Sequence, residues 1–203
     1  MFPKMNINKP AVSVIIPVRN GEGTIRRCLE SLFKQQGRFE VIVVDNGSTD
    51  QTRSIVREFS SVILLLEPKK GSYRARNKGI DAAKGNILVF LDADCFPSED
   101  WLSELIAPFK QQEVWCVGGD IIPEGTDTFL KRYQNMFFHR QDLFMKAEVP
   151  FFATSNCAVR KEGFRFPEDI LSGGDILSMS GNRGSLNFVP EAKVAHHYPS
   201  LPG

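Results

Sequence analysis

"NILVFLDADCFPSED", residues 86–100, leads an apolar run directly into two aspartates that stand one residue apart. Residues 87–91 are all apolar, and Asp92 and Asp94 follow with only an alanine between them. A continuous apolar run of this length is typical of a β-strand that is buried on both faces. The stretch therefore predicts a buried strand whose carboxyl end carries a pair of negative charges.

Three similar apolar runs precede this one, and a segment with helical character follows each of the four. Four strand–helix units in succession predict an α/β fold, with a mainly parallel twisted sheet and helices on both faces, as in a Rossmann-like three-layer sandwich. The expected strands are 11–18, 39–48, 61–68 and 86–91, and the expected helices lie within 24–35, 51–59, 72–84 and 98–106.

The regular alternation ends at about residue 112. Beyond it, residues 114–123 and 151–160 are predicted strands, and residues 127–146 have a helical pattern. A chain of 203 residues is long enough for one core of ordinary size. We therefore expect residues 1–203 to form a single domain with a less regular second half.

The composition excludes several classes of function. The net charge of +1 supplies no overall field that would attract nucleic acid or an anionic membrane. The four cysteines form no CxxC pair, so zinc-ligand spacing is absent and a reducing compartment is expected. The start of the chain lacks the apolar segment of a signal peptide, and no apolar run approaches the roughly 20 residues that cross a bilayer. We expect a cytoplasmic protein that does not bind nucleic acid.

Carboxylates gather at one edge of the predicted sheet. Right-handed crossovers place the carboxyl ends of parallel strands together, so Asp45, Asp92 and Asp94 are expected at the edge where open α/β sheets bind ligands. Two adjacent carboxylates repel each other unless a cation lies between them, and Mg²⁺ or Mn²⁺ binds such oxygens together with substrate phosphates. The alternatives are that Asp94 caps the next turn, that Asp92 is solvated, and that Asp45 closes an Asx-turn.

Four segments of the sequence together resemble a known protein family. "VSVIIPVRNGEGTIRRCLESL", "FEVIVVDNGSTDQT", "GSYRARNKGIDAAKGNILVFLDADCFPSEDWL" and "VPEAKVAHHY" resemble family 2 glycosyltransferases with the GT-A fold, in order and over nearly the whole chain. The resemblance implies a nucleotide-sugar donor, a divalent metal and inversion at the anomeric carbon. It also implies a nucleotide-sugar-binding half at 1–112 and an acceptor-side half at 113–203.

The resemblance assigns the donor site residue by residue. Pro17, Val18 and Asn20 match the loop that lies against the nucleobase, and Asp45 matches the acid that meets the base. Asn46 replaces an aspartate that is common in the family.

The phosphate and metal sites follow from the same resemblance. Arg76 and Asn77 match a stretch near the nucleotide, where Arg74 is a competitor for the diphosphate. Asp92 and Asp94 match the D-x-D pair, with Asp94 as the direct metal ligand. His196 matches a position that completes the metal shell, and His197 beside it leaves that choice open.

The resemblance also indicates the general base, since an inverting transferase needs a carboxylate that takes the acceptor proton. Asp175 in "LSGGD" stands at the family position of the base, with Gly174 where a glutamate is frequent. The arginine that usually follows in the family is missing. Glu168 and Asp169 are rival candidates, and a turn aspartate that caps the next helix is the structural alternative.

The sequence indicates the sugar donor and the acceptor only by chemical class. A UDP-sugar is favoured over a GDP-sugar, and the acceptor is a glycan, a lipid-linked saccharide or a small molecule. The aromatic and basic residues within 129–152 indicate either peripheral contact with the inner face of a membrane or a helix that packs on the sheet. The second is favoured because the basic residues occupy several helical faces.

Two other functions fit parts of the pattern. A non-catalytic module that binds a nucleotide sugar or a glycan would share the fold. A sugar-phosphate nucleotidyltransferase would also share it, but the glycine-rich basic loop expected after the first strand is absent. Neither GxGxxG nor GxxxxGK[ST] occurs, which excludes a typical Rossmann dehydrogenase or P-loop nucleotidase.

Overall fold

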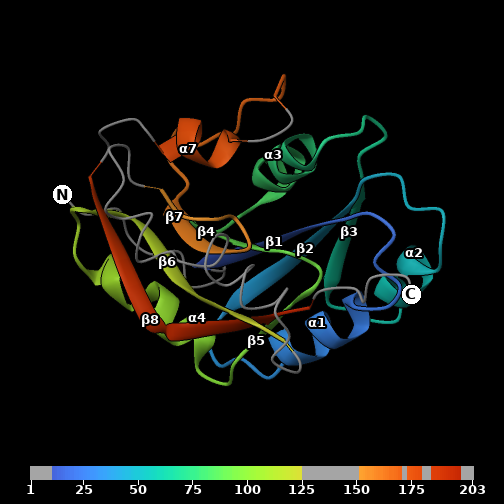
Figure 1. The fold of residues 1–203 in the computed structure, drawn as a ribbon, viewed down its shortest axis with the longest axis horizontal. Helices are drawn as coiled ribbons and strands as arrows, with labels where there is room; N and C mark the ends of the chain where they lie inside the picture. Colours follow the sequence, from blue (N-terminus) through green and yellow to red (C-terminus); the bar gives the residue numbers. More distant parts are fainter. Residues whose placement is uncertain (1–10, 125–150, 171–172, 180–183, 198–203) are drawn as a thin grey trace.

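The computed structural model describes residues 11–124, 151–170, 173–179 and 184–197. Within them, eight strands form one sheet in the order β3-β2-β1-β4-β7-β6-β8-β5 (Figure 1). The predicted helix at 127–146, with the aromatic and basic residues that begin at 129, lies outside the described residues.

The first half of the sheet is parallel, as the apolar runs predicted. β1 pairs with β2 and β4, and β2 pairs with β3, all in parallel. These strands are β1 (Val12–Val18), β2 (Phe39–Asp45), β3 (Val62–Leu66) and β4 (Ile87–Leu91). Because they run in one direction, their carboxyl ends share one edge, where Asp45 and Asp92 follow the apolar runs.

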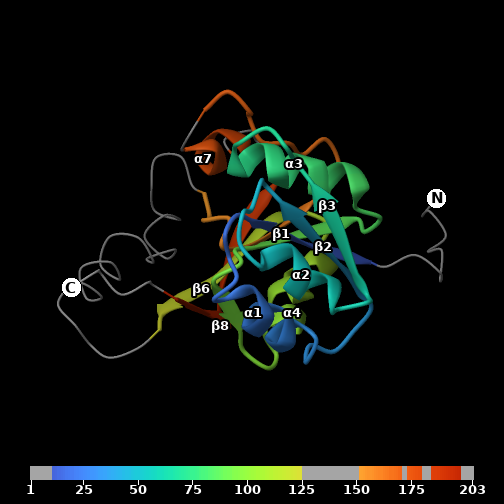
Figure 2. The ribbon, with the colours of Figure 1, turned by 90° about the vertical axis from the view of Figure 1, so that its right-hand side faces the viewer.

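Helices cover both faces of the sheet, which confirms the three-layer arrangement (Figure 2). One face packs against α1, α2 and α4, and the other against α3 and α7. The strand β1 shows the division, since Val14 and Ile16 face the α1 side while Ile15 between them faces α3. The helices are α1 (Ile25–Leu32), α2 (Thr52–Arg57), α3 (Ser72–Ala82), α4 (Trp101–Ile106), the 3-10 helix η1 (Ala107–Lys110) and α7 (Gly174–Met179).

The second half of the sheet is mixed. β7 runs antiparallel to both β4 and β6, β8 is parallel to β6, and β5 is antiparallel to β8. The strands are β5 (Cys95–Pro97), β6 (Val114–Pro123), β7 (Asn156–Arg160) and β8 (Ser185–His196). The predicted strand 114–123 agrees with β6, whereas only the second half of 151–160 is a strand.

A bulge interrupts the ladder between β6 and β8. The register passes from Gly119 opposite Val189 to Asp120 opposite Lys193. The fully buried Asn156 fills the irregularity, because its amide donates to the carbonyls of Asp120 at 2.8 Å and Ala192 at 2.9 Å. The bulge thereby sets how the last residues of β8 reach the sheet edge.

No helix within the described ranges is both long and apolar enough to cross a bilayer.

Candidate active site

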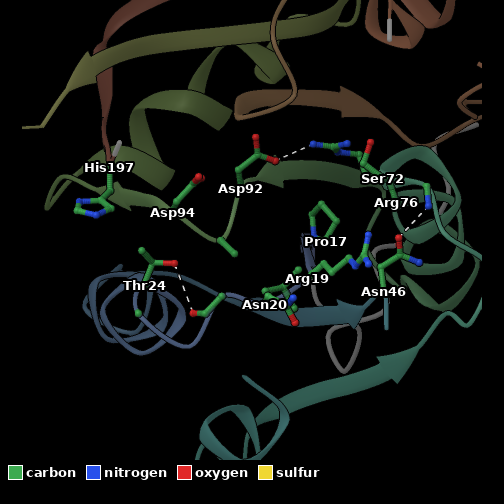
Figure 3. A pocket seen from close by; sticks show the side chains of 15 residues that line it. Pro17, Arg19, Asn20, Thr24, Asn46, Ser72, Arg76, Asp92, Asp94 and His197 are labelled. Atoms are coloured by element: carbon green, nitrogen blue, oxygen red, sulfur yellow. Dashed lines mark hydrogen bonds and ion pairs between the residues drawn. The ribbon is translucent and has the colours of Figure 1, made fainter. Parts of the chain in front are cut away.

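A cavity of about 780 Å³ opens at the carboxyl edge of the parallel strands (Figure 3). Its walls come from the loop after β1, the end of β2, the start of α3, the segment after β4 and the residue after β8. Of the predicted site residues, six line it, namely Pro17, Val18, Asn20, Arg76, Asp92 and Asp94. The topology thus brings together residues that are up to 77 positions apart in the chain, since Pro17 and Asp94 face the same cavity.

Arg76 provides the buried positive charge of the cavity. Its guanidinium donates from Nη2 to Asp92 Oδ1 at 2.6 Å, and its side chain is only 6% exposed. Arg76 Nε is buried without a partner among the described residues. Arg74, the predicted competitor, instead pairs with Glu168 at 2.8 Å and lies outside the cavity lining. Arg76 is therefore the one of the two arginines that lines this cavity.

Asp94 and His196 form a candidate metal site. The distance from Asp94 Oδ1 to His196 Nε2 is 3.6 Å, and ligand atoms of both residues and of Cys95 lie within 4.8 Å of one another. Burial raises the pKa of the Asp94 carboxyl, and the charge of Asp92 adds to this, although His196 works in the opposite direction. Burial also raises the pKa of the Cys95 thiol, and the charges of Asp92 and Asp94 add to this. Carboxylate oxygens suit Mn²⁺ or Mg²⁺, and a neutral imidazole beside them can complete the shell of a transition metal.

His197 lines the cavity, whereas His196 does not. The backbone amide of His197 donates to the Asp94 carbonyl at 2.8 Å. Its ring Nδ1 lies 3.0 Å from Glu124 Oε2, and Glu124 also forms an ion pair with Arg27. The two histidines thus have separate environments, one beside the Asp94 carboxylate and one at the cavity wall.

Asp45 is buried behind the cavity and does not line it. Its Oδ1 accepts hydrogen bonds from the amides of Gly47 at 3.3 Å and Ser48 at 3.2 Å, which is the Asx-turn geometry. Its Oδ2 has no partner among the described residues, and the side chain is 2% exposed. The contact between Asp45 and a nucleobase stays a prediction.

Asn77 also points away from the cavity. Its amide exchanges two hydrogen bonds with the backbone of Phe166, at 2.9 Å and 3.0 Å, and donates a third to Glu168 at 3.0 Å. These bonds fasten α3 to the segment before α7. Direct contact of Asn77 with the nucleotide stays a prediction, and the structure gives it a bracing role.

Asp175 lies in the first turn of α7, away from the lining of this cavity. Its Oδ2 accepts from the amide and the hydroxyl of Thr154, at 3.2 Å and 3.4 Å. Its Oδ1 is buried without a partner in the parts of the chain that the structure describes. Of the rival bases, Glu168 is engaged by Arg74 and Asn77, and the side chain of Asp169 is 96% exposed.

Sequence reasoning missed several cavity residues. Arg19, Thr24 and Ser72 line the cavity without having been predicted, whereas Asn46 was noted only as the replacement of an aspartate and His197 only as the alternative to His196. Arg19 extends along the cavity toward Asn46 (Figure 3). The available signal was position, because all of these residues follow the end of a strand or begin a helix on the same edge. The side-chain type alone did not separate them from ordinary turn residues.

Comparisons with known proteins agree with this arrangement. The family described as Glycosyl transferase family 2 matches residues 13–166. Glycosyltransferase AglE of Haloferax volcanii is 37% identical over 188 residues, which cover 85% of this chain and 61% of that protein. A PGL/p-HBAD biosynthesis glycosyltransferase of Mycobacterium tuberculosis is 36% identical over 126 residues, 58% of this chain and 49% of that protein. The chain thus spans roughly half to six-tenths of the length of these relatives.

Solved structures share the fold. Mannosyltransferase PcManGT from Pyrobaculum calidifontis, in complex with GDP-Man and Mn²⁺, aligns with a TM-score of 0.74 and 24% identity over 95% of this chain and 58% of that one. S. aureus TarS 1-349, in complex with UDP-GlcNAc, aligns with a TM-score of 0.70 and 21% identity over 95% of this chain and 59% of that one. These alignments confirm the GT-A-like fold. Since the family match covers most of the sequence, the chain belongs to glycosyl transferase family 2.

Proposed function

We propose that this chain is the donor-binding and catalytic domain of an inverting glycosyltransferase. It would move a sugar from a nucleoside diphosphate donor, UDP ahead of GDP, to a hydroxyl group of an acceptor. The observation that carries the proposal is the cavity in which Arg76, Asp92 and Asp94 meet at the carboxyl edge of the parallel strands. Residues 1–112 would bind the donor and residues 113–203 the acceptor, within one domain.

The cavity suits an anionic ligand of nucleotide size. Pro17, Asn20 and Asn46 form its end beside β1 and β2, where a nucleobase and ribose would lie. Arg76 contacts Asp92 at 2.6 Å in this cavity and would hold the diphosphate, for which a planar guanidinium is a suitable hydrogen-bond donor. The GDP-Man, UDP and UDP-GlcNAc complexes of structural neighbours support a nucleotide-sugar donor, and they do not decide between uracil and guanine as its nucleobase.

Asp94 and His196 would hold a divalent cation, Mn²⁺ or Mg²⁺, with Asp92 as a further ligand. When bound, the cation supplies positive charge that stabilises the leaving diphosphate, so that no protein acid is needed. The Mn²⁺ present with two structural neighbours supports this cofactor class. Arg76 assists by holding Asp92 in place at 2.6 Å.

Asp175 would act as general base. The acceptor oxygen forms a bond to the anomeric carbon as its proton passes to Asp175 Oδ1, and the bond from that carbon to the diphosphate oxygen breaks on the opposite face. Thr154 holds the other carboxylate oxygen, and Oδ1 has no hydrogen-bond partner among the described residues. The acceptor is proposed as a glycan, a lipid-linked saccharide or a small molecule.

A cytoplasmic location is proposed as well, with peripheral contact at the inner face of a membrane as the variant that a lipid-linked acceptor would need. The four cysteines are all buried and free, which fits a reducing compartment.

The test combines binding with turnover. Ligand at about 100 times its Kd stabilises a protein by ~2.7 kcal/mol, which raises the Tm of a chain of this size by about 5–11 °C. We expect such a rise with UDP or GDP and Mn²⁺, its loss in Asp94→Ala, and its retention in Asp175→Asn, which should lose transfer. A binding module would show the same rise without donor turnover, and a nucleotidyltransferase would make the donor from a nucleoside triphosphate and a sugar phosphate.

A further inference from the structure

The hydroxyl of Tyr73 lies beside the proposed base. The amide of Gly174, in the first turn of α7, donates to Tyr73 Oη at 2.9 Å. Such amides at a helix start have no partner within the helix, so the phenol satisfies a group that would otherwise be buried and unbonded. Tyr73 belongs to α3, and this contact joins the donor-side helix to the helix that carries Asp175.

The ring of Tyr73 is fixed by its surroundings. It is 7% exposed and stacks on Phe166, with ring centroids 5.4 Å apart and an angle of 20° between the planes. A Cβ added at Gly174 would lie 2.5 Å from Tyr73 Cζ, far inside the contact distance. No side chain fits at position 174 while the ring is in place, so glycine is required there.

The phenol of Tyr73 and the carboxylate of Asp175 also interact electrostatically. Burial raises the pKa of Tyr73, and the negative charge of Asp175 raises it further. The phenol therefore stays protonated and can donate a hydrogen bond while its oxygen accepts one from Gly174. Thr154 holds Asp175 from the other side, through Oδ2.

Tyr73 and Arg76 stand three residues apart on α3, which places them on the same side of the helix. Arg76 Cζ lies 5.9 Å from the Tyr73 ring centroid, and Arg76 reaches Asp92 in the donor cavity. The helix α3 therefore contacts Asp92 in the cavity through Arg76 and contacts the start of α7 through Tyr73.

We propose that Tyr73 is a positioning residue, which fixes the first turn of α7 and so directs Asp175 Oδ1 toward the acceptor hydroxyl that attacks the donor. This proposal rests on the proposed role of Asp175 as general base. Tyr73 itself does not touch the reacting atoms and acts through Gly174 and Asp175.

The test uses the 203-residue chain with Mn²⁺ and UDP- or GDP-hexoses, and follows release of the nucleoside diphosphate with water as the acceptor. Enzyme is kept in excess over donor so that slow variants remain measurable. Tyr73→Phe keeps the stacked ring and removes only the hydroxyl. We expect the release rate to fall roughly tenfold, while the Kd of UDP with Mn²⁺, measured by calorimetry, changes by less than about twofold.

Three further variants separate positioning from general damage. Gly174→Ala should reproduce the loss of rate because its methyl group displaces the ring. Ser103→Ala, which removes an exposed hydroxyl on α4, should leave both rate and Kd unchanged. In an Asp175→Asn background, Tyr73→Phe should alter the residual rate by less than about twofold, since the two residues act as a unit.

The results distinguish the two proposals. A full tenfold loss in the Asp175→Asn background, or an equal loss of UDP affinity, would overturn the positioning role of Tyr73. A normal rate in Tyr73→Phe with a slow Asp175→Asn would remove this role and leave the base in place. A normal rate in Asp175→Asn would overturn both.

Discussion

The substitution Asn46→Asp tests whether the cavity at the carboxyl edge of the sheet depends on the side-chain amide that follows β2. Asn46 is 6% exposed, and its Nδ2 donates to the carbonyls of Glu67 at 2.9 Å and Lys69 at 2.8 Å. Its Oδ1 accepts from the amide of Gly71 at 2.8 Å. The three bonds fasten the whole connection between β3 and α3. Aspartate keeps the shape and the acceptor but cannot donate when it is ionised.

The expected loss of stability follows from the two hydrogen bonds that Asn46 Nδ2 no longer donates. Each hydrogen bond contributes about 1 kcal/mol net, and a buried carbonyl left without a donor costs about 1–3 kcal/mol. Because some of the carbonyls can turn toward water, we expect the free energy of unfolding to fall by about 2–4 kcal/mol. Gly71 and Ser72 line the cavity, so the loosened connection should also weaken UDP binding, by about tenfold.

Urea unfolding followed by fluorescence measures the first effect, and calorimetry with UDP and Mn²⁺ measures the second. Asn86→Asp is the matched control, since Asn86 is exposed and the same change there should stay within about 0.5 kcal/mol. A loss below about 0.5 kcal/mol in Asn46→Asp would refute the reasoning, because the carbonyls would then not need the amide.

Three other substitutions test separate parts of the structure. Arg76→Lys should weaken UDP binding in calorimetry by about tenfold because it loses the forked donor, whereas Arg74→Lys, outside the cavity, should leave it unchanged. Asn156→Asp should lower the free energy of unfolding in urea by about 2–4 kcal/mol, since two buried donors at the bulge are lost, and an unchanged midpoint would contradict this. The third substitution concerns Asp50. Burial alone would raise the pKa of the Asp50 carboxyl, but hydrogen bonds from Thr52 and from the Glu22 amide outweigh burial and lower that pKa. The unfolded chain then binds more protons, so this stabilisation is present above about pH 4 and is lost as the pH falls further. Asp50→Asn should flatten that acid limb in pH-dependent melting, and an unaltered slope would argue against the contribution.

The parallel half of the fold was predictable because burial on both faces leaves continuous apolar runs, such as that of β4. The shared edge followed from chain direction alone, and it placed Asp92 and Asp94 correctly at the cavity. The mixed half was not predictable in this way. β7 and β8 pair with strands distant in sequence, and the bulge beside Asn156 changes the register without leaving a mark in the hydrophobic pattern.

Side-chain direction was the other limit. A strand-end residue can face the cavity, as Asp92 does, or turn inward to its own loop, as Asp45 does. Both outcomes use the same residue type in the same position, and only neighbouring amides decide between them. For the same reason, the sequence could not tell that His197 rather than His196 lines the cavity, because that depends on the pairing of Cys95 with His196.

The path of the chain after β4 explains why two aspartates one residue apart have different partners. β4 lies in the middle of the sheet, whereas β5, which follows only three residues later, lies at its far edge against β8. The segment 92–94 therefore crosses the carboxyl edge from the parallel half to the mixed half. Asp92, at the start of the crossing, meets Arg76 from α3, and Asp94, at its end, meets His196 from β8. A strand that continued straight would have put both carboxylates against the same neighbours. The crossing instead gives one carboxylate a fixed guanidinium and leaves the other beside an imidazole.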